Sequence, residues 1–163
     1  MSETNGAGDA PQTAASETAG PPIVVNVQYV RDFSFENPNA PQSLMASNGP
    51  PEVAVNVNVG ARGLQPDTFE VTLSLTATAK HAQTTAFICE VVYAGIFTLN
   101  GVPPEHVQPV LLIECPRLLF PFARAMVADA TRDGGFPPLL IQPIDFVELY
   151  RREAGNNEGE AQA

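Results

Sequence analysis

Apolar and polar residues alternate in four successive segments of the chain. A period of two is typical of a β-strand that is buried on one face. The clearest case is residues 53–59, where every second residue is valine. The other three predicted strands cover residues 25–36, 69–78 and 84–99. Several strands with short links and one apolar face indicate an antiparallel sheet.

The first predicted strand carries five large apolar residues at odd-numbered positions. It ends at the segment ENPNAP, residues 36–41, because proline removes a backbone donor from a sheet and asparagine favours turns. With uninterrupted alternation, the residues on its buried face are Val25, Val27, Tyr29, Phe33 and Phe35.

The spacing becomes helical in residues 116–135. Gly134 and Gly135 are suited to end this helix as a C-terminal cap. Pro121 is expected in the first turn, where a proline does not remove a needed hydrogen bond. Apolar residues three and four positions apart share one face of a helix. That face is predicted to carry Leu119, Phe122 and Met126.

A last helix is predicted in the segment PIDFVELYRRE, residues 143–153. Asp145 is suited to cap its N-terminus, and Arg151 and Arg152 are suited to its C-terminal end, where the helix dipole favours cations. Its apolar stripe consists of Phe146, Leu149 and Tyr150. Strands followed by helices predict an α+β fold, a four-stranded antiparallel sheet covered on one face by helices from the C-terminal part.

Both ends of the chain lack the apolar residues that a folded segment needs. Residues 1–22 and 154–163 are rich in small, polar and acidic residues, and neither can bury enough surface to offset the entropy of ordering. We therefore predict disordered acidic tails at 1–22 and 154–163. The segment between them, 23–153, is predicted to form a single domain.

The chain is strongly acidic, with 18 Asp and Glu against 8 Lys and Arg. This balance argues against nucleic acid and anionic membranes as partners and favours a basic protein partner. The sequence contains no long apolar run that would insert into a membrane, and no secretory signal. We predict a cytoplasmic protein.

The sequence offers little support for catalysis or metal binding. It has no glycine-rich phosphate loop, and its two histidines and two cysteines are not at metal-ligand spacing. His81 is expected at a hairpin tip and His106 in a loop. Cys89 and Cys115 are expected to be free thiols rather than a disulfide. A Cys–His nucleophile is a less favoured alternative.

Two features remain that suggest binding. Strand parity puts the carboxylates of Asp32, Glu36 and Glu90 on the side of the sheet opposite its core. Parity alone favours a plain solvated face over a docking site. Large apolar residues also occur in proline-flanked segments, where they either pack beneath loops or line a groove for apolar chains. They are Leu44, Met45, Phe136, Leu139 and Leu140.

Read in order, the chain resembles the SecB protein-export chaperones. The resemblance rests on RDFSFENPNAP (31–41), PEVAVNVNV (51–59), TTAFICEVVYAGIFTL (84–99) and LLFPFARAMVADATRDGGFPPLLIQPIDF (118–146). It implies an ATP-independent chaperone without a cofactor, assembled as a homotetramer that is a dimer of dimers. Such a protein holds unfolded precursor proteins and delivers them to the SecA motor.

The resemblance also implies two separate binding surfaces. In the family, acidic residues on the outer sheet face dock the basic, zinc-holding C-terminal tail of SecA. The matching residues here are Asp32, Glu36, Ile88 and Glu90. Clients would bind in a groove between the loop after the first strand, the sheet and the last helix. Its candidate residues are Leu44, Met45, Val55, Val57, Phe136, Leu140, Phe146, Leu149 and Tyr150.

Two departures and two alternatives accompany this interpretation. The N-terminal tail is longer than the family needs, and the link GARGLQPD (60–67) between the second and third strands is short. One alternative function is a SecB-like chaperone dedicated to another client, such as an antitoxin. The other is a small-molecule enzyme on an oligomeric α+β scaffold.

Overall fold

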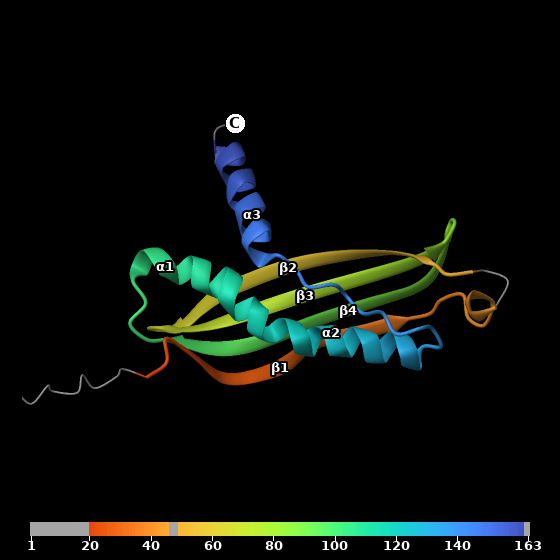
Figure 1. Ribbon diagram of the computed structural model, residues 1–163, viewed down its shortest axis with the longest axis horizontal. Helices are drawn as coiled ribbons and strands as arrows, with labels where there is room; N and C mark the ends of the chain where they lie inside the picture. Colours follow the sequence, from red (N-terminus) through yellow and green to blue (C-terminus); the bar gives the residue numbers. More distant parts are fainter. Residues whose placement is uncertain (1–19, 46–48, 162–163) are drawn as a thin grey trace, which may run out of the picture.

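The computed structural model describes residues 20–45 and 49–161. Four long strands form one antiparallel sheet in the spatial order β1-β4-β3-β2. The strands are β1 (Ile23–Glu36), β2 (Glu52–Gln65), β3 (Thr68–His81) and β4 (Thr84–Leu99). A long helix lies across one face of this sheet (Figure 1). The predicted fold class is confirmed.

The helical part begins earlier than predicted. Helix α1 (Pro104–Pro109) continues through a π-helical turn, η3 (Val110–Glu114), into α2 (Cys115–Asp133). His106 therefore lies in a helix, and the prediction of a loop there is wrong. Proline suits the first turn of a helix, which lets α1 begin at Pro104. The π turn directly follows Pro109, whose missing N–H interrupts the regular hydrogen-bond pattern.

The core lies between α2 and the inner faces of the two central strands. Its members include Leu73, Leu75, Val91 and Phe97 from the strands and Leu119, Phe120, Ala123 and Val127 from the helix. Each large buried side chain contributes about 1.5–3 kcal/mol of transfer free energy. α2 approaches β4 closely at Gly95, where a Cβ atom would lie 2.8 Å from the Phe97 ring and 3.1 Å from Leu119.

The predicted apolar face of α2 was partly wrong. Leu119 is fully buried, but Phe122 is 51% exposed and stacks on Tyr93 with ring centroids 5.9 Å apart. Pro121 lies inside α2 rather than in a first turn, because the helix starts well before it. Because α1 and η3 precede it, α2 is rotated about its axis, and the face that it turns toward the sheet differs from the one predicted from residues 116–135 alone.

Strand β1 departs from simple alternation at two β-bulges. Its register against β4 shifts between Val25 and Val27 and again between Val30 and Asp32. A bulge inserts one extra residue, so the side chains beyond it change face. Val27 and Tyr29 consequently pair with residues of the outer face, so the prediction that they lie on the buried face is wrong. Val25 and Phe33 do lie on the helix side but are 38% and 43% exposed, so their predicted burial is wrong as well.

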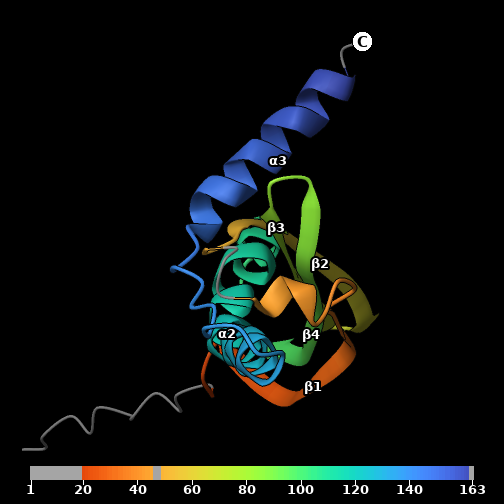
Figure 2. The same ribbon diagram turned by 90° about the vertical axis from the view of Figure 1, so that its right-hand side faces the viewer.

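Helix α3 (Phe146–Ala161) projects away from the sheet (Figures 1 and 2). Asp145 caps it as predicted, because the Glu148 backbone N–H donates to the Asp145 carboxylate at 3.0 Å. The helix continues to Ala161, so a disordered tail does not start at residue 154. Arg151 and Arg152 consequently lie within the helix rather than at its end. Residues 1–19, which make up most of the predicted N-terminal tail, and 162–163 lie outside the described residues.

Two other sequence predictions concern individual residues. Cys89 and Cys115 are free and buried, and burial raises the pKa of their thiols to about 11 and about 12. His81 is the last residue of β3, next to the two-residue hairpin turn, as predicted. No helix in residues 20–45 and 49–161 is long and apolar enough to cross a membrane.

Candidate binding surfaces

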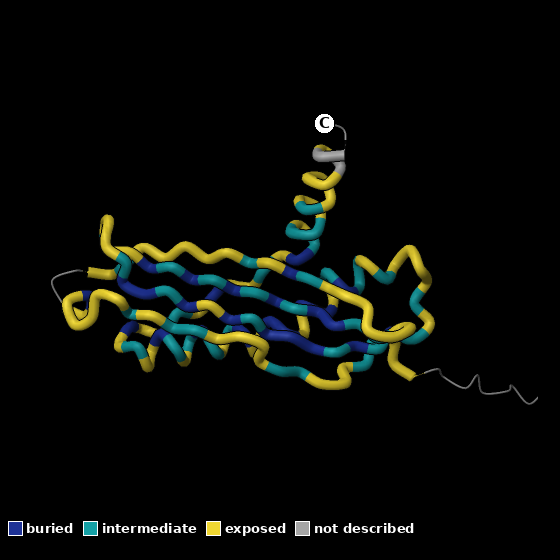
Figure 3. Tube along the Cα trace, turned by 180° about the vertical axis from the view of Figure 1, so that it is seen from behind, coloured by how far each residue is buried: buried dark blue, intermediate teal, exposed yellow. Residues whose placement is uncertain are grey.

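The outer face of the sheet is not covered by the helices. Figure 3 views the molecule from this side and shows the sheet with buried central strands and exposed edges. β3 contributes threonine and serine to this face, because its alternate residues are the buried core. A polar face of this kind fits a surface that contacts water or a polar partner.

The predicted docking residues lie together on the outer face of the β1–β4 pair. Glu36 pairs directly with Ile88, and Asp32 pairs with Val92. Glu90 pairs with Ser34, between these two positions. The three carboxylates therefore surround a short stretch of two adjacent strands, and all three residues are exposed. The sequence placed these side chains on one face, and the strand register brings them next to one another.

A second group of charges lies further along the same face, around Glu70. Its carboxylate accepts hydrogen bonds from Arg31 Nη1 at 2.9 Å, from Arg62 Nε at 3.0 Å and from the Tyr29 hydroxyl. The glutamate side chain is 7% exposed, whereas the two arginine side chains are at least half exposed. The hydrogen bond from Tyr29, with the hydrogen bond from Arg62 and the positive charges of Arg62 and Arg31, outweighs desolvation and lowers the pKa of Glu70.

Sequence reasoning missed this group. A signal for one of its pairs was present: Arg62 and Glu70 lie on either side of the β2–β3 hairpin turn and pair directly in its register. The approach of Tyr29 and Arg31 has no comparable signal, because it spans β4 and depends on the bulges of β1. Ala94 pairs with Tyr29 on the intervening strand, and its small side chain leaves room for the tyrosine to reach β3.

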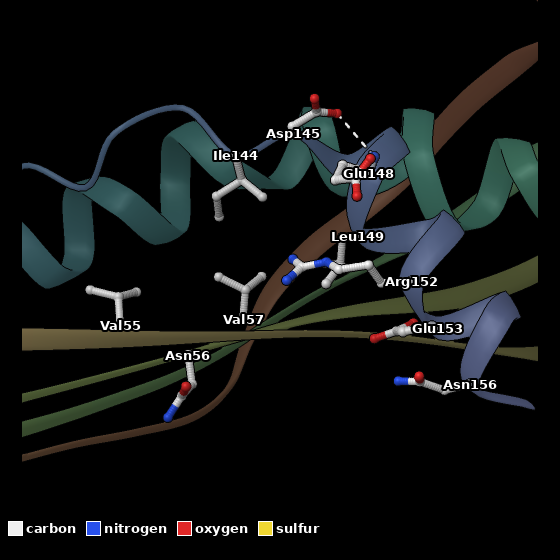
Figure 4. A pocket seen from close by; sticks show the side chains of 10 residues that line it. All are labelled: Val55, Asn56, Val57, Ile144, Asp145, Glu148, Leu149, Arg152, Glu153 and Asn156. Carbon is white, nitrogen blue, oxygen red and sulfur yellow. Dashed lines mark hydrogen bonds between the residues drawn. The ribbon is translucent and has the colours of Figure 1, made fainter. Parts of the chain in front are cut away.

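On the helix side, a groove of about 450 Å³ lies between β2 and the start of α3. Val55 and Val57 point into it from β2, whereas Asn56 between them points away (Figure 4). Ile144 and Leu149 face the two valines from the other wall. The rim is charged and carries Asp145, Glu148, Arg152 and Glu153.

A second hollow, of about 320 Å³, lies at the far end of the sheet. Leu44 and Met45, around the end of the 3-10 helix η1 (Gln42–Leu44), form one side, and Phe136 forms another. Phe136 also packs against Phe87, with ring centroids 4.9 Å apart. Leu44 fits closely over Gly135, whose φ of 94° is a conformation that favours glycine.

The two hollows are connected by the segment 137–145, which runs back from α2 to α3 (Figure 1). Its backbone is anchored where the Leu139 N–H donates to the buried Thr131 hydroxyl at 2.9 Å. Leu140 is 58% exposed on this segment. Val53 is 39% exposed on β2, two residues before Val55. Sequence reasoning did not select Ile144, which lines the groove.

Three predicted groove residues do not line either hollow: the exposed Leu140, Phe146 and Tyr150. Phe146 is 1% exposed and packs edge-on against Phe120, with ring centroids 6.2 Å apart. It belongs to the core, because the first turn of α3 is the part of that helix that contacts the body. Tyr150 is half-buried on α3, but it does not line the groove of Val55 and Val57.

A third apolar area lies along β1 and the adjoining side of α2. Val30 pairs with Tyr93, whose ring stacks on Phe122, and Phe33 lines a shallow hollow with Met126. Val30, Phe33 and Phe122 are each more than 40% exposed. An apolar area of this kind commonly marks an interface.

Among the described residues, no group of three or more His, Cys, Asp or Glu side chains is placed to hold a metal ion.

Known proteins match this chain over most of its length. A family model described as preprotein translocase subunit SecB matches residues 16–157. The protein-export protein SecB of Rhodospirillum centenum is 56% identical over 155 residues, 94% of this chain and 92% of that protein. The protein of the same name from Bradyrhizobium diazoefficiens is 48% identical over 164 residues, 97% of this chain and 99% of that protein.

A solved structure also shares the fold. It is a SecB-like chaperone from Mycobacterium tuberculosis in complex with a peptide from an antitoxin, with a TM-score of 0.63 and 14% identity. The match covers 75% of this chain and 90% of that one. At this identity the likeness is one of fold.

Proposed function

Since this chain belongs to the SecB family of protein-export chaperones, we propose that it holds unfolded precursor proteins in the cytoplasm, without ATP, and delivers them to SecA. The family match over residues 16–157 is the observation that carries this conclusion. The apolar groove beside β2 supports client binding, and the carboxylates on the opposite face support a separate dock for SecA. The proposed activity is binding and release rather than catalysis.

Client capture is assigned to the path along β2. It runs from the hollow at Leu44 and Phe136, past Val53, to the groove of Val55 and Val57. Six strand residues span about 20 Å, so an extended client segment would contact both hollows at once. Each apolar contact is weak, and affinity would come from several contacts on one segment and several subunits.

SecA docking is assigned to Asp32, Glu36, Ile88 and Glu90. The carboxylates are exposed and close together on a rigid pair of strands, which suits a basic partner segment. Ile88 is half-buried beside Glu36 and offers an apolar contact within the acidic area. The zinc in this pairing is held by the SecA tail.

The proposed assembly is a homotetramer built as a dimer of dimers. The exposed apolar side chains of Val30, Phe33 and Phe122 support a contact between copies of the chain at β1 and α2. We expect Phe33→Asp to lower the mass in solution below that of the wild-type tetramer, as measured by light scattering after size exclusion. A wild-type protein that is monomeric would contradict the assembly.

The chaperone activity is tested with a slowly folding precursor diluted from denaturant. Equimolar tetramer should slow its refolding and suppress its aggregation without ATP. A fast-folding variant of the same precursor serves as the control, because it buries its apolar segments before capture. If the slow precursor refolds and aggregates as it does alone, the chaperone assignment is wrong.

The docking assignment is tested with a variant that carries Asp32→Lys, Glu36→Lys and Glu90→Lys. It should lose binding to the SecA tail and retain client capture, and wild-type affinity should fall as salt rises. Unchanged tail binding in a folded variant would refute the site. Client capture by a wild-type protein that does not bind SecA would instead indicate a chaperone that serves another pathway.

A further inference from the structure

The second bulge of β1 decides which way the docking carboxylates point. Val30 pairs with Tyr93 and Asp32 with Val92, so Arg31 is the extra residue. A shift by one residue moves every following side chain to the other face of a sheet. The bulge therefore allows Tyr29 before it and Asp32 after it to lie on the same outer face, although they are three residues apart.

The extra residue itself is fixed by a contact that reaches across β4. Arg31 Nη1 donates to Glu70 Oε1 at 2.9 Å, and Glu70 lies on β3, two strands away from β1. The Tyr29 hydroxyl donates to the other oxygen of the same carboxylate. Glu70 is 6% exposed, so its charge needs these partners. The buried carboxylate thus ties both residues that flank Val30 to the middle of the sheet.

The first bulge of β1 has a similar tie. Its extra residue, Asn26, donates from its side-chain amide to the Thr98 hydroxyl on β4 at 2.8 Å. Each extra residue of β1 is therefore held by a side chain from another strand. The backbone ladder does not itself hold the extra residue of a bulge, because that residue is left unpaired. Without a side-chain tie, a neighbouring residue can take its place as the extra one.

We propose that Arg31, held by Glu70, is a positioning residue that keeps the bulge directly before Asp32 and so fixes the Asp32 carboxylate on the docking face. Arg31 need not touch the partner. This inference rests on the proposed role of the outer face in binding the SecA tail. It adds that the affinity of the outer face for the basic SecA tail depends on Arg31, although Arg31 is itself positively charged.

The charge of Arg31 and its positioning role predict opposite changes in affinity for the tail when Arg31 is removed. Removing Arg31 makes the outer face more negative and should strengthen binding of a basic tail. Loss of the tie should weaken binding, because the bulge is then free to move and Asp32 no longer has a fixed place. Arg62 provides a matched control: it donates to the same Glu70 oxygen at 3.0 Å, but from the unbulged part of β2.

The experiment measures binding of the zinc-loaded SecA tail peptide by calorimetry to the full-length wild type, Arg31→Gln, Arg62→Gln and Arg31→Lys. We expect Arg31→Gln to bind about tenfold more weakly, the equivalent of one charge-assisted contact. Arg62→Gln should bind as wild type or more tightly. Arg31→Lys keeps a donor for Glu70 and should restore most of the affinity. Equal or tighter binding by Arg31→Gln than by Arg62→Gln overturns the proposal.

A double-mutant cycle separates positioning from a general loss of stability. In a protein that already carries Asp32→Asn, Arg31→Gln should cause less than a twofold further change, because its effect passes through Asp32. Additive losses overturn the proposal. If Arg31→Gln does not fold, Glu70→Gln is compared with Glu114→Gln, an equal charge change on the helix side, and equal affinities overturn the proposal.

These outcomes are distinct from failure of the proposed function. If the wild-type protein does not bind the tail, or if reversal of Asp32, Glu36 and Glu90 leaves binding intact, the docking assignment itself is wrong. If the wild type binds and the reversal abolishes binding, the docking assignment stands. The comparison of Arg31→Gln with Arg62→Gln then decides the role of Arg31 alone.

Discussion

The outer face of the sheet and the groove on its helix side are built in different ways. On the outer face, Asp32, Glu36 and Glu90 come from two adjacent strands, and the hydrogen-bond ladder sets the spacing between them. The groove and the second hollow together take their walls from β2, the end of η1, the segment 137–145 and α3, which are separate elements of the chain. A ladder is rigid, whereas such a composite groove can change its width. The first suits one defined partner, and the second suits many different clients.

The two surfaces also differ in the force that drives binding. Contacts on the outer face are exposed charges, whose energy falls with ionic strength. Contacts in the groove are apolar, and their energy comes from surface removed from water. Salt should therefore weaken docking and leave client capture largely unchanged. The following changes are designed to separate the two surfaces, beginning with the largest expected effect.

The largest effect is expected for Val55→Asp combined with Val57→Asp. Both side chains point into the groove (Figure 4), and carboxylates there must lose hydration when an apolar client segment binds. We expect client affinity to fall at least about a hundredfold, or about 3 kcal/mol, in a competition assay with an unfolded precursor. Binding of the SecA tail should change less than about threefold.

The control for that pair is Ala54→Asp combined with Asn56→Asp. These residues alternate with the two valines on β2 and pair with the outer-face residues Thr78 and Thr76. The control adds the same charge to the same strand on the opposite side. A client affinity that falls equally in both variants would contradict the assignment of the groove to the valine side.

The next effect concerns the contact between the end of α2 and β1, beside the shallow hollow of Phe33 and Met126. A Cβ atom at Gly134 would overlap the Phe35 ring, and Phe35 stacks on Phe87 with centroids 5.8 Å apart. Gly134→Ala should therefore push the end of α2 away from β1 and lower the free energy of unfolding by about 2 kcal/mol. Urea denaturation provides the measurement. Gly155→Ala, where the added atom meets nothing within 4 Å, is the control and should be neutral or slightly stabilising.

The contrast between the two surfaces also explains what the sequence could predict. Parity within β4 and within the second half of β1 was enough to group Asp32, Glu36 and Glu90, because alternation is a local property of a strand. The predicted faces of Val27 and Tyr29 were wrong because the alternation was taken as uninterrupted. Arg31, a charged residue at a position of the predicted apolar face, was the trace of the second bulge in the sequence. Tyr29 and Arg31 were not linked to Glu70, because they meet it only through the order of strands in the sheet.

The groove was harder to predict because its walls are distant in sequence. Val55 and Leu149 were identified separately, yet nothing in the pattern shows that β2 and α3 face each other. Phe146 was assigned to the groove because it shares the apolar stripe of α3 with Leu149. The apolar stripe of α3 does not show which of its turns packs on the core and which turn lies beyond the core. The length of α3 was missed because the sequence after residue 153 is polar.

A smaller effect is expected for Thr131→Val, which preserves the shape of the side chain. The Thr131 hydroxyl is fully buried, accepts from the Leu139 N–H at 2.9 Å and donates to the Val127 carbonyl at 2.9 Å. Valine leaves the Leu139 N–H without this partner, at a cost of about 1–2 kcal/mol. Hydrogen exchange should accelerate in residues 137–145 and stay unchanged in β1, where the carboxylates lie. Acceleration in both regions would show that the two surfaces are not independent.

The smallest effect is a pH dependence, because a single carboxyl group contributes to it. The hydrogen bonds from Tyr29 and Arg62 lower the pKa of Glu70 below its ordinary value of 4.5, so the folded protein favours the ionised form. Its contribution to the free energy of unfolding is fully present above pH 4.5 and is lost as the pH falls through the lower folded-state pKa. Wild type and Glu70→Gln should therefore differ more in urea denaturation at pH 7 than at pH 3.5.

The control is Glu90→Gln, which removes an exposed carboxylate from the same face. Its free energy of unfolding should differ little from that of wild type at pH 7. A gap for Glu70→Gln that stays constant or widens in acid would mean that Glu70 is not held as a charged anchor. The backbone hydrogen bonds between β1 and β4 would then be sufficient to hold the docking carboxylates in place.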